Sequence, residues 1–326
     1  MPLRRRLLNL LSDGEFHSGE TLGVSLGVSR MAVWKHIKAL REAGVDLTVL
    51  RGKGYRLPAS LELLERNKIL AAARAATVSA IDRIDVFLEV DSTNNWLRGQ
   101  VLNGAPSGTV CVSEMQSAGR GRRGRSWVSP FAANLYLSLL WRSANGAATL
   151  GGLSLVTGIA VLRALRSFGI NEAGLKWPND ILAADAKLAG ILVEVLGECS
   201  GPCAVIVGIG VNVNMRPDEA TAIDQSWTDL QQLTGDNSIS RNDLAARLLD
   251  EVIPAIATFD EAGLRPFIDE WRQYDLVSGR EVDVLLPNER VTGTACGIDE
   301  GGALLVETLH GRRWFASGEV SVRLGS

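Results

Sequence analysis

Gly119-Arg120-Gly121-Arg122-Arg123-Gly124-Arg125-Ser126-Trp127 is the most informative stretch of this sequence. Glycines lack a Cβ and let a loop approach a ligand closely, and arginines present a fixed fork of N–H donors to phosphate or carboxylate oxygens. The stretch therefore predicts a loop that folds over an anionic ligand. A nucleic-acid patch and a solvated charged loop are the two alternatives.

The charge of the 326-residue chain is unevenly distributed. The whole chain carries a formal charge of -3, but residues 1–60 carry +5 and the remainder therefore -8. A basic module on an acidic body can meet nucleic acid while the rest of the chain stays in solution. The length predicts two or three domains.

Cysteine usage and hydropathy predict a cytoplasmic protein. The four cysteines are spread out, and the pair Cys199 and Cys203 has no histidine nearby, which favours unpaired thiols in a reducing compartment over a metal site. No segment approaches the ~20 apolar residues that a membrane span requires.

Residues 1–62 have the pattern of a winged helix-turn-helix. Apolar periodicity predicts three short helices, the third from Arg30 to about Ala43, followed by a hairpin around Arg51–Gly54. In that arrangement the third helix lies in the major groove of DNA, and the wing reaches the backbone. A docking module or a solvated helix face is the alternative. The residues predicted to act at DNA are Ser29, Arg30, Lys35, Lys38 and Lys53.

The rest of the chain completes an α+β fold. Residues 63–83 are predicted to form a linker helix. Residues 84–275 alternate between strands and helices, with too little chain between several strands for crossover helices, which favours a largely antiparallel sheet. Residues 276–326 predict short alternating strands, typical of a small SH3-like β-barrel.

Four further segments of the central domain carry unusual side chains. Asp91–Asn94 offers hydroxyl and amide groups for a neutral ureido or amide ligand, and a helix N-cap is an equally good interpretation. Lys176–Asp180 offers oxygens to a metal or a cation, with a plain turn as the alternative. Lys187 begins an apolar strand and needs a charged partner if it is buried. Gly208–Asn214 permits close approach of a ligand, and Asn212 could bind a base edge.

The common nucleotide-binding and nucleophile motifs are missing from the sequence. It has no G-x-x-x-x-G-K-[ST] loop, and Gly208–Asn214 lacks the third glycine of a dinucleotide fingerprint. Only three histidines occur, two of them in the basic module. Catalysis is therefore expected to depend on charge stabilisation and positioning, without a covalent intermediate on the protein.

Together these segments resemble the biotin protein ligase family. The Gly119–Trp127 stretch is similar almost letter for letter to the family's biotin and adenylate loop, and 176–180 and 187–194 match its other two motifs. With the winged helix, nearly the whole chain resembles the bifunctional form that also represses the biotin operon. Ser126 stands where the family pattern has a lysine, and residues 217–240 carry no recognisable motif.

The resemblance implies a set of site residues. For catalysis these are Arg120, Asp180 and Lys187. For biotin they are Ser92, Thr93, Asn94, Gln116, Arg120, Gly121, Arg122 and Lys187. For ATP and the adenylate they are Arg122, Arg125, Trp127, Asn179, Asp180 and Asn212. Mg²⁺ is expected to be held mainly by the ATP phosphates, with Asp180 as a candidate ligand.

The resemblance also implies a two-step reaction and its partners. Biotin and ATP give biotinyl-5′-adenylate, and a lysine of a biotin carboxyl carrier protein then takes the biotin. The adenylate is implied as corepressor, with a homodimer binding operator DNA and the C-terminal barrel supporting ATP and carrier-protein binding. Two alternatives are a regulator that senses a ligand without turnover and a lipoyl ligase. The Gly119–Trp127 loop is then best interpreted as a lid over the adenylate.

Overall fold

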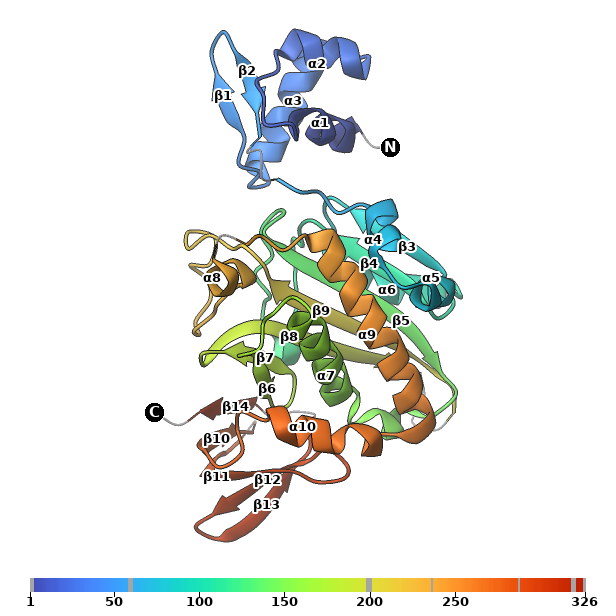
Figure 1. Cartoon of the computed structure of the whole chain (residues 1–326), viewed down its shortest axis with the longest axis vertical. Helices are drawn as coiled ribbons and strands as arrows, with labels where there is room; N and C mark the ends of the chain where they lie inside the picture. The colour runs from blue at the N-terminus through green and yellow to red at the C-terminus, as the bar shows by residue number, and fades with distance from the viewer. Residues whose placement is uncertain are drawn as a thin grey trace.

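The computed structural model describes residues 3–57, 61–197, 201–235, 237–286, 288–317 and 321–324. Three groups of elements follow one another along the chain (Figure 1): a small helical unit with a hairpin, a seven-stranded sheet covered by helices, and a five-stranded sheet. The expected α+β class is confirmed.

The N-terminal unit is three helices and a hairpin, as predicted: α1 (Leu3–Leu11), α2 (Gly19–Leu26), α3 (Arg30–Glu42), β1 (Thr48–Leu50) and β2 (Gly54–Arg56). Serine side chains cap the second and third helices. Ser18 Oγ accepts from Thr21 N at 3.0 Å, and Ser29 Oγ accepts from Ala32 N at 3.2 Å. Each bond satisfies an amide that the first helical turn leaves free.

The linker differs from its prediction. The single helix expected over 63–83 is wrong: residues 61–65 are not helical, and two short helices follow, α4 (Arg66–Ala72) and α5 (Ala75–Ala80). Arg74 N donates to Asp250 Oδ1 at 2.9 Å, and the Arg74 guanidinium pairs with Glu251 at 2.8 Å. These contacts with another helix hold the backbone extended between α4 and α5, so tertiary structure overrides local helix propensity.

The central sheet has the strand order β3-β4-β5-β9-β8-β7-β6. Among the strands that the structure describes, β3 and β4 alone pair in parallel, so the sheet is largely antiparallel, as expected. The bounds are β3 (Arg83–Phe87), β4 (Thr109–Ser113), β5 (Asn134–Ser143), β6 (Gly174–Lys176), β7 (Asp180–Ala183), β8 (Ala186–Leu196) and β9 (Cys203–Asn212).

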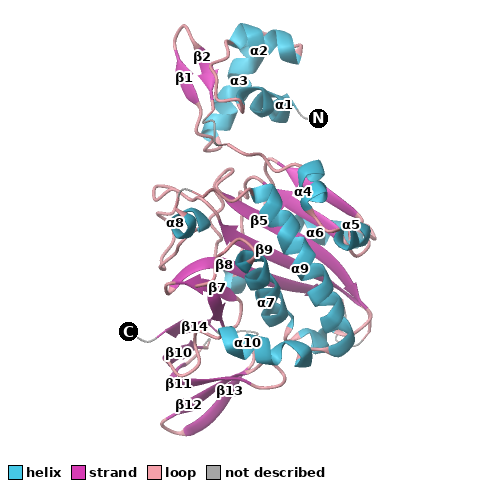
Figure 2. Ribbon diagram, viewed as in Figure 1, coloured by secondary structure: helices cyan, strands magenta, loops and turns pink. Residues whose placement is uncertain are grey.

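Helices cover both faces of this sheet (Figure 2). Helices α7 (Leu153–Arg166) and α9 (Arg241–Ala262) pack on each other and on the face that holds the main apolar core. Helix α6 (Thr93–Leu102) packs on the other face, where Leu97 meets Cys111 and Ile206. Val110 and Val112 face the main core while Cys111 faces α6, as strand alternation requires.

The C-terminal sheet is antiparallel throughout, in the order β13-β12-β11-β10-β14. Its buried side chains join the main core, and Trp177 Nε1 donates to Gly302 O at 3.0 Å. Closure of the sheet into an SH3-like barrel stays a prediction. The strands are β10 (Glu281–Leu285), β11 (Arg290–Ile298), β12 (Leu304–Thr308), β13 (Gly311–Phe315) and β14 (Ser321–Leu324).

The remaining elements are short connectors. Helix α8 (Leu230–Thr234) precedes α9, and α10 (Ile268–Tyr274) precedes the C-terminal sheet. The 3-10 turns lie at Arg122–Gly124, Ala147–Leu150 and Arg265–Phe267. The first of these turns falls within the arginine and glycine loop.

Candidate functional site

A cavity of about 350 Å³ lies over strands β5, β8 and β9. The arginine and glycine loop forms one wall, and residues 222–227 form part of another. Apart from Asp180, the residues predicted to bind biotin or ATP all line it: Ser92, Thr93, Asn94, Gln116, Arg120, Gly121, Arg122, Arg125, Trp127, Asn179, Lys187 and Asn212.

One end of the cavity carries neutral hydrogen-bonding groups. Gln116 Oε1 accepts from Thr93 N at 2.9 Å, and Gln116 Nε2 donates to Ser129 Oγ at 3.0 Å. Ser92 occupies the N-cap position of α6, but its side chain makes no capping bond. Ser92 and Thr93 are buried and Gln116 is half-buried, and all three line the cavity, which suits an uncharged polar ring.

Glu194 organises the same end and was missed in the sequence. Its carboxylate accepts from Asn94 Nδ2 at 2.8 Å and from Arg120 Nη2 at 2.8 and 3.0 Å. The available signal was an acidic residue within the apolar strand β8. Ser138 was also missed, and its Oγ donates to Asn94 Oδ1 at 2.6 Å. With these bonds the Asn94 amide is used to hold the site together.

The arginine and glycine loop is folded back on itself. Gly121 N donates to Arg125 O at 2.7 Å, and Trp127 N donates to Gly119 O at 2.9 Å. A Cβ on Gly119 would lie 2.4 Å from Trp127 O, so this close approach requires glycine. Arg123 adopts a positive φ of 60° and donates to Leu285 O at 3.2 Å, which ties the loop to the C-terminal sheet.

The indole of Trp127 rests on two glycines of the sheet. A Cβ on Gly210 would lie 2.6 Å from the ring, and one on Gly190 would lie 2.9 Å from it. Lys187 Nζ is 5.3 Å from the centre of the ring. Within the described part of the chain, the Trp127 Nε1 is buried and has no hydrogen-bond partner.

Arg122, Asp180 and Lys187 form a charged group that we call the cavity cluster. Lys187 Nζ lies 2.7 Å from Asp180 Oδ1, within ion-pair distance but not aligned as a hydrogen bond. Arg122 Nη1 donates to Asn179 Oδ1 at 3.1 Å. Burial lowers the pKa of Arg122, and the nearby Asp180 carboxylate opposes that shift.

Lys176 adds a third cation beside the same carboxylate. It pairs with Asp180 in the β6–β7 register, and burial lowers its pKa while Asp180 raises it. Three cations therefore surround one carboxylate. The positive excess favours binding of an anion such as a phosphate or carboxylate.

Residues 222–227 reach the cavity, although no recognisable motif marks this stretch of the chain. Lys187 N donates to Ser226 O, and Thr228 N donates to Lys187 O, each at 3.0 Å. Asn212 Nδ2 donates to Lys187 O at 3.2 Å and to Thr228 O at 3.0 Å. The Asn212 amide thus holds this segment against β8. Trp227 was the one large side chain that could have signalled it.

The predicted DNA-contacting residues lie on or beside the third helix and wing. Lys35, Lys38 and Lys53 are exposed. Lys38 Nζ is 3.6 Å from Glu42 Oε1 and 5.8 Å from the centre of the Trp34 ring. The sequence interpretation missed Met31 and Trp34, which are 62% and 47% exposed on the same helix.

The described residues were also compared with what a metal site and a membrane-spanning helix require. Across 3–57, 61–197, 201–235, 237–286, 288–317 and 321–324, His, Cys, Asp and Glu side chains form no cluster of three or more suited to a metal ion. Cys203 is buried, and Cys199 lies outside the described residues. In the same ranges, every helix is too short or too polar to span a bilayer.

Comparisons with known proteins agree with this architecture. Family models match residues 86–212 (Biotin/lipoate A/B protein ligase family), 3–56 (HTH domain) and 277–323 (Biotin protein ligase C terminal domain). The bifunctional ligase/repressor BirA of Escherichia coli is 42% identical over 98% of this chain and 96% of its own length. The protein of that name from Bacillus subtilis is 32% identical over 98% of each chain.

A solved biotin protein ligase structure is also similar to this chain. Biotin protein ligase from Aquifex aeolicus, in complex with biotin and ATP, is 32% identical with a TM-score of 0.64. The match covers 75% of this chain and 100% of the Aquifex chain. Full-length similarity to the Escherichia coli and Bacillus proteins, together with the three matched domains, decides the classification. The chain belongs to the biotin protein ligase family, with the domain order of its bifunctional ligase/repressors.

Proposed function

We propose that this protein activates biotin with ATP and transfers it to a lysine of a biotin carboxyl carrier protein. The observation that carries the proposal is a single cavity with neutral amide and hydroxyl groups at one end and the cavity cluster nearby. A ureido ring suits the neutral groups, and a carboxylate meeting an α-phosphate suits the cations.

In the first step a biotin carboxylate oxygen attacks the α-phosphorus of ATP. The new P–O bond forms biotinyl-5′-adenylate, and the bond to the leaving pyrophosphate breaks. The two reactants are both anionic and repel each other. Lys187 and Arg122 are half-buried at the cavity, where fixed positive charge stabilises the transition state more effectively than it would in water. Mg²⁺ enters with the ATP phosphates, and Asp180 is the candidate carboxylate on the protein.

In the second step a carrier-protein lysine attacks the acyl carbon of the adenylate. The amide bond forms and AMP leaves with the electrons of the broken C–O bond. The mixed anhydride must be kept from water until the carrier arrives. We assign this role to the Gly119–Trp127 loop, with Trp127 covering the adenine and Arg125 beside the phosphate.

A direct assay tests the ligase proposal. The protein is incubated with biotin, ATP, Mg²⁺ and a biotin carrier domain, and the mass of the carrier is measured. The expected result is the addition of one biotinyl group. A carrier of unchanged mass would favour the alternative regulator that senses a ligand without turnover. Lipoate added as a competitor distinguishes the lipoyl ligase, because only a lipoyl site would be strongly inhibited.

We further propose that the N-terminal unit binds operator DNA as part of a homodimer. Arg30, Lys35 and Lys38 give the third helix a cationic face, and Met31 and Trp34 add exposed apolar surface between them. Lysines contact phosphates, and apolar groups contact thymine methyls in the major groove. Two recognition helices are needed for a pseudo-palindromic site, with the adenylate as the proposed corepressor.

Two measurements test the DNA and dimer proposals. Lys35→Ala should weaken binding to any duplex and reduce the salt dependence of affinity by about one phosphate contact. Unchanged affinity and salt slope would remove Lys35 from the interface. Sedimentation with and without biotin and ATP should show a doubled mass only with both ligands, and a constant mass would contradict ligand-linked dimerisation.

A further inference from the structure

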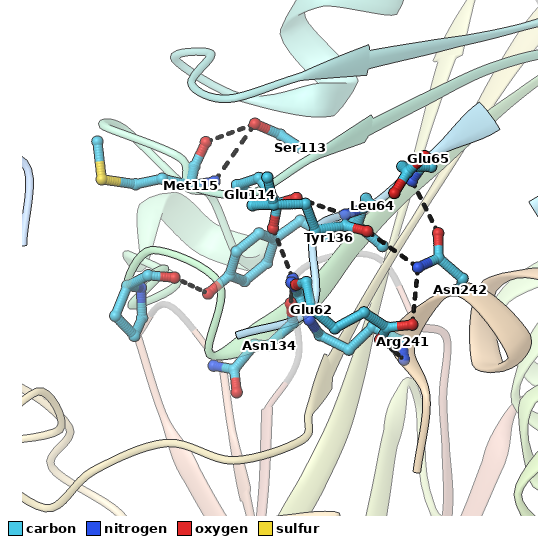
Figure 3. A network of polar contacts seen from close by, with 12 residues as sticks. Glu62, Leu64, Glu65, Ser113, Glu114, Met115, Asn134, Tyr136, Arg241 and Asn242 are labelled. Carbon is cyan, nitrogen blue, oxygen red and sulfur yellow. Dashed lines mark hydrogen bonds and ion pairs between the residues drawn. The ribbon is translucent and has the colours of Figure 1, made fainter. Parts of the chain in front are cut away.

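A buried ion pair lies outside the cavity and takes no part in the proposed chemistry. Arg241 Nη1 is 2.7 Å from Glu114 Oε2, and the two side chains are 5% and 0% exposed (Figure 3). Burying two charges costs several kcal/mol of desolvation free energy, and apolar replacements often serve stability as well. The position of this pair therefore needs an explanation other than stability.

The first set of hydrogen bonds around the pair fixes the linker. Arg241 N donates to Glu62 Oε2 at 2.6 Å, and its guanidinium also donates to the Glu62 carbonyl. Asn242 donates to Leu63 O at 3.0 Å and accepts from Glu65 N at 2.8 Å. The non-helical linker is thus fixed at the N-terminus of α9. We call Glu62, Glu114, Arg241 and Asn242 the linker network.

A second connection runs from Glu114 to the neutral end of the cavity. Glu114 directly follows β4, and its Oε1 accepts from Leu64 N of the linker at 2.6 Å. Two residues later, Gln116 binds Thr93 at the cavity wall. A shift of Glu114 must therefore move the strand end that positions Gln116.

A third connection runs from Arg241 to the cavity wall that residues 222–227 form. Arg241 Nη1 donates to Asn134 O at 3.3 Å, and Asn134 Oδ1 accepts from Val213 N at 3.0 Å. Val213 follows β9 and begins the segment that carries residues 222–227 to the cavity. Arg241 is thus bonded directly to Glu114, below the first cavity-lining segment, and reaches Val213, at the base of the second, through Asn134.

The linker in turn holds the N-terminal unit. Arg5 of α1 is only 7% exposed and donates to Leu64 O. Leu64 therefore binds Glu114 through its N–H and Arg5 through its carbonyl. Any change in the position of Leu64 acts on the first helix of the DNA-binding unit.

We propose that Arg241 and Glu114 are positioning residues that couple occupation of the cavity to the linker. Binding of ligands orders residues 117–128 and 222–227, whose bases this pair holds. The ordering then restrains Glu62 and Leu64, and with them the placement of the N-terminal unit. The inference rests on the proposed function, because it takes biotin and ATP as the ligands.

Hydrogen exchange measured by mass spectrometry tests this coupling in the full chain. Biotin plus ATP should slow exchange of the 61–65 amides and of the cavity segments by about tenfold, as expected for segments that become more stable. In the double variant Arg241→Met, Glu114→Gln, the cavity segments should still be protected while the linker response is lost. Glutamine keeps an acceptor for Leu64 N and removes the charge.

Two other variants keep the test decisive if the double variant does not fold. Glu62→Ala removes only the Glu62 side chain from the hydrogen bonds that fix the linker, so biotin transfer and cavity protection should persist while the linker response disappears. Asp250→Asn is the matched control, because Asp250 is a buried residue of α9 that holds Arg74 and lies outside the linker network. It should respond like the wild type.

Three results would overturn the inference. The first is wild-type protection of the cavity segments without any change at 61–65. The second is a normal linker response in both the double variant and Glu62→Ala. The third is a loss of response in Asp250→Asn as complete as in Glu62→Ala. Failure of the proposed function is distinguishable, because neither the cavity segments nor the linker of the wild type would then respond to biotin and ATP.

Discussion

The cavity cluster and the linker network use the same residue types in different surroundings. In the linker network the central ion pair is 5% and 0% exposed, and its oxygens are hydrogen-bonded to the linker and α9. In the cavity cluster Lys187 and Asp180 are each 12% exposed, and Asp180 Oδ1 has no aligned donor among the described residues. A satisfied pair holds structure together, whereas an incompletely satisfied pair beside a cavity retains capacity for a ligand.

The largest effect on stability is expected from Arg241→Met alone. It leaves Glu114 buried without its cation, which should lower the free energy of unfolding by about 3–5 kcal/mol. Urea denaturation followed by circular dichroism measures this change. Adding Glu114→Gln should recover much of the loss. A loss below about 1 kcal/mol for the single variant would mean that water already reaches this pair.

Lys187→Ala should impair the reaction strongly and the stability of the fold little, the reverse of what is expected for Arg241→Met. Biotin-dependent ATP–pyrophosphate exchange should fall by at least about a hundredfold, because a preorganised charge is removed from the transition state. The unfolding midpoint should change little, since the side chain borders a cavity. Exchange at the wild-type rate would exclude Lys187 from the chemistry.

Arg120→Gly should instead accelerate dissociation of the adenylate, and an unaltered dissociation rate would contradict a retaining role for Arg120.

Gly210→Ala tests the cavity floor, with a smaller expected effect. Its Cβ would lie 2.6 Å from Trp127, so the indole must move and KM for ATP should rise about tenfold with a smaller change in kcat. Gly99→Ala is the control, because its Cβ would meet open space on α6. Equal kinetics for the two alanine variants would contradict contact between Trp127 and ATP.

The smallest effect is expected at an ion pair of the C-terminal sheet, between the exposed Arg290 and the largely buried Asp283. Asp283 accepts hydrogen bonds from Arg290 and Thr292, which lower its pKa below 3.8. Asp283→Asn should lower the unfolding midpoint slightly at neutral pH, because the stabilising carboxylate is charged above its unfolded pKa. The difference should vanish as the pH falls through the lowered pKa of Asp283. A pH-independent difference would assign the effect to packing.

Much of the local structure was predictable. Apolar periodicity placed the third helix from Arg30 to about Ala43, close to α3, and the apolar strand expected to begin at Lys187 is β8. The linker was mispredicted because its helix is interrupted by Asp250 and Glu251, which lie far along the chain. Residues 222–227 and Glu194 were missed for the same reason, since their roles come from contacts with Lys187 and Arg120.

The sequence alone determined the chemistry that the chain can offer. Its arginines, glycines, amides and hydroxyls indicated an anion-binding loop and a neutral pocket, because side-chain type sets charge, donors and conformational freedom. Only the tertiary structure decided which of these groups are available. Arg120 is paired with Glu194, Asn212 holds a loop, and Arg241 joins the linker to the cavity walls. Such roles depend on burial and on partners distant in sequence, which local pattern does not contain.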